Sequence, residues 1–154
     1  MKKTITLNVN DREYDLVTPV NRTLTQVLRE NLKLTGTKQG CSVGDCGSCT
    51  VLLDEEPVNS CLVLAVEAEG HRIQTIEGLS DNQNLHPIQQ AFVDQGGIQC
   101  GFCSPGMILS AKVLLDKNPS PSESEIREAI SGNLCRCTGY QKIVEAIESV
   151  TKES

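Results

Sequence analysis

The eight cysteines of this 154-residue chain fall into two groups of four, with none between residues 62 and 99. The first group comprises Cys41, Cys46, Cys49 and Cys61, and the second comprises Cys100, Cys103, Cys135 and Cys137. Two closed sets of four thiols are what two tetrathiolate metal sites require. Three interpretations compete for so many cysteines in so short a chain: disulfides, structural zinc and iron–sulfur clusters.

The N-terminal segment makes disulfides a poor explanation. The first ten residues contain two lysines but no apolar core, so we expect no signal peptide and a cytoplasmic protein, in which thiols stay reduced. No apolar run approaches 18 residues, so we expect no membrane span. A net charge of −6 with only 3% aromatic residues makes a nucleic acid an improbable partner.

The first set follows the pattern C-x4-C-x2-C with a fourth cysteine farther along, which is the plant-type spacing for a [2Fe–2S] cluster. The loop over residues 38–49 is rich in glycine. Glycine reaches the backbone conformations needed to wrap a chain around a cluster, and it lets amide N–H groups approach the sulfur atoms. Zinc sites prefer paired knuckles, so this set predicts iron and sulfide.

The second set is less specific, because it combines a C-x2-C pair with a C-x-C pair. On spacing alone, zinc stays open here beside an iron–sulfur cluster. A thioredoxin-type redox site is disfavoured, since no βαβ pattern surrounds the C-x2-C pair.

Hydrophobic periodicity predicts an α+β arrangement in the first half of the chain, with a small sheet and one helix over 23–32. The expected strands cover residues 4–9, 14–17, 50–53, 58–66 and 72–76. Cys61 would lie within the strand 58–66. A polar stretch over residues 79–85 then predicts a domain boundary.

The second half predicts four helices packed as a bundle. The first is short and centres on Ile88, and the last covers residues 140–150. Ser104 is expected to cap the second helix, and Ser122 opens the third with a capping box. The second cysteine set would then lie at helix ends, where a helix N-terminus favours thiolate charge.

Three segments of the chain, over residues 38–49, 99–107 and 132–140, closely resemble the iron–sulfur subunit of the xanthine dehydrogenase (molybdenum hydroxylase) family. The likeness spans residues 3–150. It implies a β-grasp domain of the plant-ferredoxin type over residues 1–77 and a helical four-helix bundle over residues 78–154. It also implies that the second cysteine set, like the first, holds a [2Fe–2S] cluster.

The resemblance implies a role for each site residue. The first set would hold an outer cluster facing a subunit that binds FAD, and the second an inner cluster near molybdopterin in a large subunit. Gln99 and Cys137 match the positions that contact the pterin. Ser48 stands where many relatives have alanine, and Asp45 also departs from the common pattern, but neither affects a ligand.

The implied function is a relay of single electrons between the molybdopterin site and the flavin, with no substrate chemistry on this chain. Since the chain stops at Ser154, those two centres are expected on separate polypeptides. His71 and His86 read as surface or capping residues. The alternatives are a zinc-stapled adaptor module and a free ferredoxin-like shuttle; the second domain and Gln99 argue against the shuttle.

Overall fold

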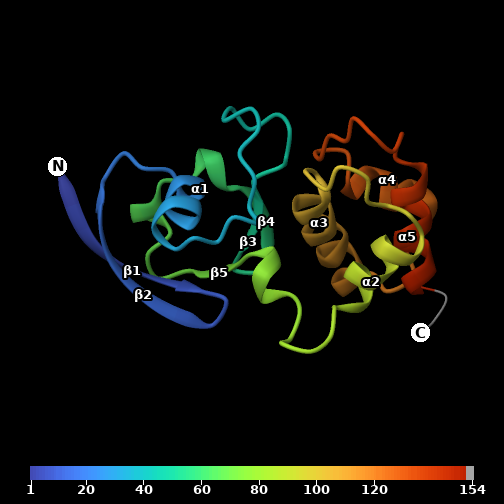
Figure 1. Cartoon of the computed structure of the whole chain (residues 1–154), viewed down its shortest axis with the longest axis horizontal. Coiled ribbons are helices and arrows are strands. Elements are labelled where there is room, and N and C mark those ends of the chain that lie inside the picture. Colours follow the sequence, from blue (N-terminus) through green and yellow to red (C-terminus); the bar gives the residue numbers. More distant parts are fainter. Residues whose placement is uncertain (152–154) are drawn as a thin grey trace.

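A five-stranded sheet forms the N-terminal half of the computed structural model, which describes residues 1–151. The strands are β1 (Lys2–Val9), β2 (Arg12–Pro19), β3 (Thr50–Leu53), β4 (Glu56–Asn59) and β5 (Arg72–Gln74). Their order across the sheet is β2-β1-β5-β3-β4. β1 and β5 run parallel, and the remaining neighbours are antiparallel. Figure 1 shows this half beside a helical half, so the chain has a mixed α+β fold, as predicted.

Two-residue turns close both hairpins of the sheet. Asn10 and Asp11 join β1 to β2, and Asp54 and Glu55 join β3 to β4; all four have positive φ. Turns of this handedness match the twist of paired strands, and Asn and Asp tolerate them best among residues other than glycine. The turn is therefore shorter than the interval left between the expected strands 50–53 and 58–66, and β4 begins at Glu56.

The strand predicted over residues 58–66 is wrong. β4 ends at Asn59, and Cys61 lies in a short 3₁₀ helix over Ser60–Leu62. The Ser60 hydroxyl donates a 2.6 Å hydrogen bond to the carbonyl of Cys49 and contacts the Thr25 hydroxyl, also at 2.6 Å. These buried contacts hold Ser60 against the first cysteine loop and turn the chain away from the sheet.

The helix predicted over residues 23–32 is present as α1 (Leu24–Gln26), which continues as a π-helical turn over Val27–Asn31. Thr23 caps it by accepting a hydrogen bond from the backbone of Gln26, whose side chain bonds back to Thr23. Its buried face packs with the inner face of the sheet to form one hydrophobic core, which includes Ile5, Leu7, Leu24, Leu28 and Ile73.

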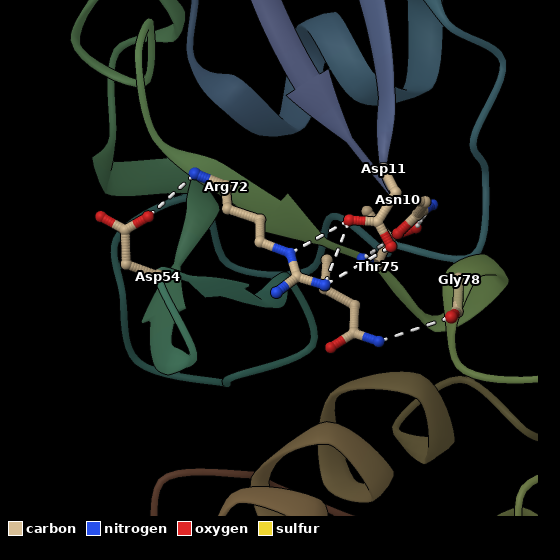
Figure 2. A network of polar contacts seen from close by, with 7 residues as sticks. Asn10, Asp11, Asp54, Arg72, Thr75 and Gly78 are labelled. Atoms are coloured by element: carbon tan, nitrogen blue, oxygen red, sulfur yellow. Dashed lines mark hydrogen bonds and ion pairs between the residues drawn. The ribbon is translucent and has the colours of Figure 1, made fainter.

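A polar network ties the two hairpin turns to β5 (Figure 2). The Arg72 guanidinium bonds to Asp11, and the Arg72 backbone N–H donates to the Asp54 carboxylate at 2.8 Å. Asn10 pairs with both the backbone and the hydroxyl of Thr75. Both turns are thereby fixed to the same end of the sheet.

The helical half consists of α2 (Pro87–Asp94), α3 (Ser104–Lys117), α4 (Glu123–Ala129) and α5 (Gln141–Thr151). The capping predictions for His86 and Ser122 are confirmed: His86 accepts a hydrogen bond from the Ile88 backbone, and Ser122 forms a capping box with Glu125. The cap predicted at Ser104 is wrong. Cys103 occupies that position, because its carbonyl accepts the first helical bond, from Met107.

The helices share a second hydrophobic core, in which Phe92, Met107, Leu109, Ile126 and Ile143 are fully buried. Leu52 of β3 also belongs to this core, and α3 packs directly on β3 and β4. The two halves therefore share a packed junction. Across residues 1–151, no helix combines the length and apolarity needed to cross a membrane.

Candidate metal centres

Backbone amides of the first cysteine loop converge on the sulfur of Cys41. The N–H groups of Val43, Asp45 and Cys46 donate to Cys41 Sγ at 3.4, 3.2 and 3.3 Å. These donors, led by Val43 and Cys46, lower the pKa of Cys41 to about 6, so the loop stabilises a thiolate. Such N–H groups also offset the negative charge of an iron–sulfur centre.

The other three thiols of the first set lie close to Cys41. Cys46 Sγ accepts a hydrogen bond from the Cys41 backbone at 3.4 Å, while Cys49 and Cys61 are both buried and in contact with each other. Burial, followed by the hydrogen bond with Cys49, raises the pKa of Cys61 to about 11. Binding a metal here would therefore release protons.

The second set also forms two pairs. Cys100 and Cys137 are exposed and hydrogen-bonded to each other, and this side-chain contact raises the pKa of Cys137. Cys103 and Cys135 lie deeper, and burial, with the contact to Cys135, raises the pKa of Cys103 to about 12. A hollow of about 540 Å³ adjoins them, and its lining includes Cys100, Phe102, Cys103, Leu134, Cys135 and Tyr140.

Thr138 and Tyr140 hold the loop around Cys135. The Cys135 backbone N–H donates to the Tyr140 hydroxyl at 2.9 Å, and Thr138 Oγ1 lies 3.1 Å from Cys135 Sγ. Burial alone would raise the pKa of Cys135, but the hydrogen bonds from Thr138 and from the Cys137 backbone outweigh it and lower this pKa. The loop thus favours thiolate at a half-buried position.

The paired arrangement suits a binuclear cluster. Within residues 1–151, no three histidine, cysteine or carboxylate side chains meet closely enough to hold one metal ion. The structure instead brings the eight free thiols into four contacting pairs. A [2Fe–2S] cluster takes four thiolates and divides them between two irons, so soft donors in two adjacent pairs fit this group.

The two cysteine loops touch each other at the junction between the halves. The Leu134 backbone N–H donates to the Cys46 carbonyl at 2.9 Å. Asn133, which is buried, donates to the carbonyl of Gly47 at 3.1 Å and to Thr50 Oγ1 at 3.2 Å. The loop before β3 and the loop between α4 and α5 lie at the same end of the molecule, the top in Figure 1.

The remaining predicted site residue, Gln99, is exposed next to Cys100. Cys100, the residue after Gln99, contacts Cys137, and both cysteines are exposed. Apolar side chains are also exposed there: Phe102 retains 46% of its accessible surface and Leu134 57%.

The sequence alone assigned no role to three residues that contact these loops: Ser48, Thr138 and Asn133. Ser48 and Thr138 each lie within three positions of the cysteine whose sulfur their hydroxyl contacts, so that proximity was the available signal. Asn133 gave no such signal, because its partners are more than 20 residues away along the chain.

Comparison with known proteins agrees with this geometry. Residues 7–80 match the family model described as a 2Fe-2S iron-sulfur cluster binding domain, and residues 75–148 match the model described as a [2Fe-2S] binding domain. Each cysteine set lies within one match. The fold and both matches therefore define an electron-transfer protein with two [2Fe–2S] binding domains.

Individual relatives indicate more closely which kind of electron-transfer protein this chain resembles. The chain is 50% identical over 146 residues to the nicotinate dehydrogenase small FeS subunit of Eubacterium barkeri, covering 95% of this chain and 93% of that one. It superposes on the crystal structure of quinoline 2-oxidoreductase from Pseudomonas putida 86 with a TM-score of 0.95 and 46% identity, covering 98% and 94% of the two chains. The aldehyde oxidoreductase of Megalodesulfovibrio gigas is 47% identical over 144 residues, which cover 92% of this chain and 16% of that protein.

The chain belongs to the iron–sulfur subunits of the molybdenum hydroxylase family, to which xanthine dehydrogenase also belongs. It is thus a subunit of an oxidoreductase, and its part in that enzyme is electron transfer. The family resemblance predicted from the three cysteine motifs is confirmed.

Proposed function

We propose that this chain relays single electrons between a molybdopterin site on a large partner subunit and FAD on a second partner subunit. One [2Fe–2S] cluster is held by Cys41, Cys46, Cys49 and Cys61, and the other by Cys100, Cys103, Cys135 and Cys137. When bound, such a cluster supplies a centre that accepts and returns one electron at a time. The chain positions the two centres, shields them and adjusts their potentials.

The observation that carries this proposal is the hydrogen bond from Leu134 N–H to the Cys46 carbonyl. Leu134 directly precedes Cys135, so this one bond joins a proposed ligand residue of the first set to the neighbour of one in the second. The proposed ligand loops are therefore adjacent, and an electron can pass between them within one chain. A free shuttle would need only one such loop.

The exposed side of the second set supports its assignment as the inner cluster. Gln99 presents an amide with both donors and an acceptor, which suits the polar edge of a pterin, and the exposed Cys137 contacts Cys100, the residue after Gln99. The apolar surface of Phe102 and Leu134 suits burial by the large subunit. The first set then serves the outer cluster, toward the flavin subunit.

The finer description of the fold is part of the same proposal. Residues 1–77 form a β-grasp domain, for which the strand order and the packing of α1 on the sheet argue. The second domain, expected over residues 78–154, is a four-helix bundle in its described part, residues 78–151, for which the shared core of α2 to α5 argues. Residues 152–154 of that prediction lie outside the described residues. We assign the protein to the cytoplasm, because a reducing compartment keeps cysteines available as cluster ligands and none of the eight forms a disulfide.

Metal analysis of the chain purified without oxygen tests the cluster assignment. We expect iron and acid-labile sulfide in amounts that account for two clusters, with visible absorption. Cys49→Ser and Cys103→Ser should each remove one cluster and leave the other. A colourless preparation that contains zinc and no iron would contradict the proposal and favour an adaptor module.

Native purification tests the partners. With a tag on this chain, we expect a large molybdenum-containing subunit and a flavin-containing subunit to be recovered in constant ratio to it. Recovery of the chain alone, still carrying both clusters, would instead identify a free shuttle.

A further inference from the structure

The hydroxyl of Ser48 lies 3.2 Å from the sulfur of Cys46. Ser48 is only 5% exposed, and among residues 1–151 Cys46 Sγ is the hydrogen-bond partner of this hydroxyl. A thiolate that binds iron has no proton to donate. In the loaded protein the Ser48 hydroxyl is therefore the donor and the sulfur is the acceptor.

Gly40 leaves the space in which this contact forms. A Cβ atom added at Gly40 would lie 2.9 Å from both Cys46 Sγ and Ser48 Oγ, and 3.6 Å from the ring of Phe102. The hydroxyl and the sulfur are thus packed between the backbone of Gly40 and the body of the loop. The donor hydroxyl is buried although Cys46 is only half-buried, and a hydrogen bond partly shielded from water is stronger than one in water.

The second set contains a similar contact, which shows how the hydroxyl proton is directed. Thr138 Oγ1 accepts a 3.1 Å hydrogen bond from the Tyr140 backbone N–H, which leaves its own proton for Cys135 Sγ, 3.1 Å away. Each cysteine set therefore has one hydroxyl next to one sulfur.

We propose that Ser48 raises the reduction potential of the first cluster by donating a hydrogen bond to the Cys46 thiolate. This inference rests on the proposed function. Reduction adds one negative charge to the centre, so a fixed donor stabilises the reduced form more than the oxidised form. Ser48 keeps its proton throughout: one electron arrives from the neighbouring reduced centre, which gives up that electron and is thereby oxidised.

The position of Cys46 gives this contact a consequence for the relay. The carbonyl of Cys46 accepts the hydrogen bond from Leu134, so Ser48 acts on the cysteine that connects the first loop to the second. A higher potential at the first cluster draws the electron from the second cluster toward the first. Ser48 therefore acts through Cys46, and it favours electron transfer from the second cluster to the first.

Ser48→Ala tests the proposal in the full chain carrying both clusters, by redox titration followed with EPR. We expect the first cluster to become harder to reduce, by about tenfold in the equilibrium constant, which is about 59 mV for a one-electron couple. The potential of the second cluster should not change. Ser48→Thr keeps a hydroxyl and should restore the potential of the unmodified protein.

Ser42→Ala is the matched control, because Ser42 lies in the same loop but its hydroxyl accepts from the Gln39 side chain at 3.0 Å. Ser42→Ala should leave the reduction potentials of both clusters unchanged. Since a midpoint potential is read on the loaded fraction, reduced occupancy does not obscure the result.

An unchanged potential in Ser48→Ala, or an equal shift in Ser42→Ala, would overturn the proposal. So would a complete failure of Ser48→Ala to load the first cluster while Ser48→Thr loads it, since the hydroxyl would then serve assembly and not potential. Absence of iron from the unmodified chain would instead refute the proposed function itself.

Discussion

Asn133 Nδ2 donates a 3.1 Å hydrogen bond to the carbonyl of Gly47, which joins two cysteine loops that are 86 residues apart in the sequence. The side chain is buried, and its other bonds reach Thr50 on the sheet side and Ser110 on the helical side. Asn133→Ala removes these bonds and leaves the buried Ser110 hydroxyl without its acceptor, while the Gly47 carbonyl and the Thr50 hydroxyl stay bonded to each other. We expect a lower urea midpoint for the holo chain, corresponding to a loss of about 1–3 kcal/mol.

Asn84→Ala is the control for that experiment, because Asn84 lies in an exposed turn. It should unfold at nearly the urea concentration of the unmodified protein. Equal midpoints for the two variants would show that the Asn133 contacts do not stabilise the junction.

Gly47→Ala should disrupt the first cysteine loop through a steric clash. Gly47 has φ +72°, and a Cβ atom there would lie 2.2 Å from the carbonyl oxygen of Gly132. Gly96 has nearly the same φ, +69°, but a Cβ atom there would meet nothing within 4 Å. Gly96→Ala therefore costs only the backbone strain, about 1 kcal/mol.

Thermal unfolding of the two glycine variants separates these effects. We expect Gly47→Ala to lower the melting temperature clearly more than Gly96→Ala and to reduce iron content as well. Similar melting temperatures would mean that the loops can separate at little cost.

Tyr140→Phe should weaken retention of the second cluster. The Tyr140 hydroxyl accepts the backbone N–H of Cys135 at 2.9 Å, and phenylalanine leaves that N–H without its partner. A loss of about 1 kcal/mol corresponds to about fivefold faster release of iron to a chelator. Tyr14→Phe, on β2, is the matched control and should release iron at the unmodified rate.

The carboxylate of Asp54 should titrate below its ordinary value. A hydrogen bond with His71 and a second from the Arg72 backbone lower the pKa of Asp54 from 3.8. Because the folded-state pKa is lowered, the contribution of Asp54 to stability is complete above about pH 3.8 and is lost as pH falls through the folded-state pKa.

His71→Ala removes the larger cause and should move the pKa of Asp54 upward. Carbon-13 NMR titration of the carboxyl groups measures this directly. Asp81 is an internal control, since its pKa is lowered by the backbone N–H groups of Gln83 and Asn84, which the substitution does not affect. A pKa of Asp54 that stays in place would assign its shift to Arg72 alone.

Hydrophobic alternation and capping signals among neighbouring residues were enough to predict most of the helices and strands. Alternation of Ile5, Leu7 and Val9 marked β1, and the box at Ser122 marked the start of α4, because both depend on neighbours in sequence. The strand predicted through Cys61 failed because Ser60 bonds to Cys49, which is brought near only by the folded loop.

The same distinction holds at the candidate site. Cysteine spacing indicated two metal centres, since ligand loops are largely local. The pairing of Cys103 with Cys135, and the bridge that Asn133 makes, depend on how α3 and the loop after α4 meet. Such contacts are decided by tertiary packing and leave no periodic signal in the sequence.

The bond between Leu134 N–H and the Cys46 carbonyl involves backbone atoms alone. Electron tunnelling slows steeply as the interval between two centres widens, and this interval is set here by main-chain atoms, by glycine at position 47, against which Gly132 packs, and by the buried Asn133 side chain. Substitution of side chains other than those at positions 47 and 133 therefore leaves the tunnelling distance nearly constant. The outer surface of the chain is free to diversify toward different partner subunits while the internal transfer rate is preserved.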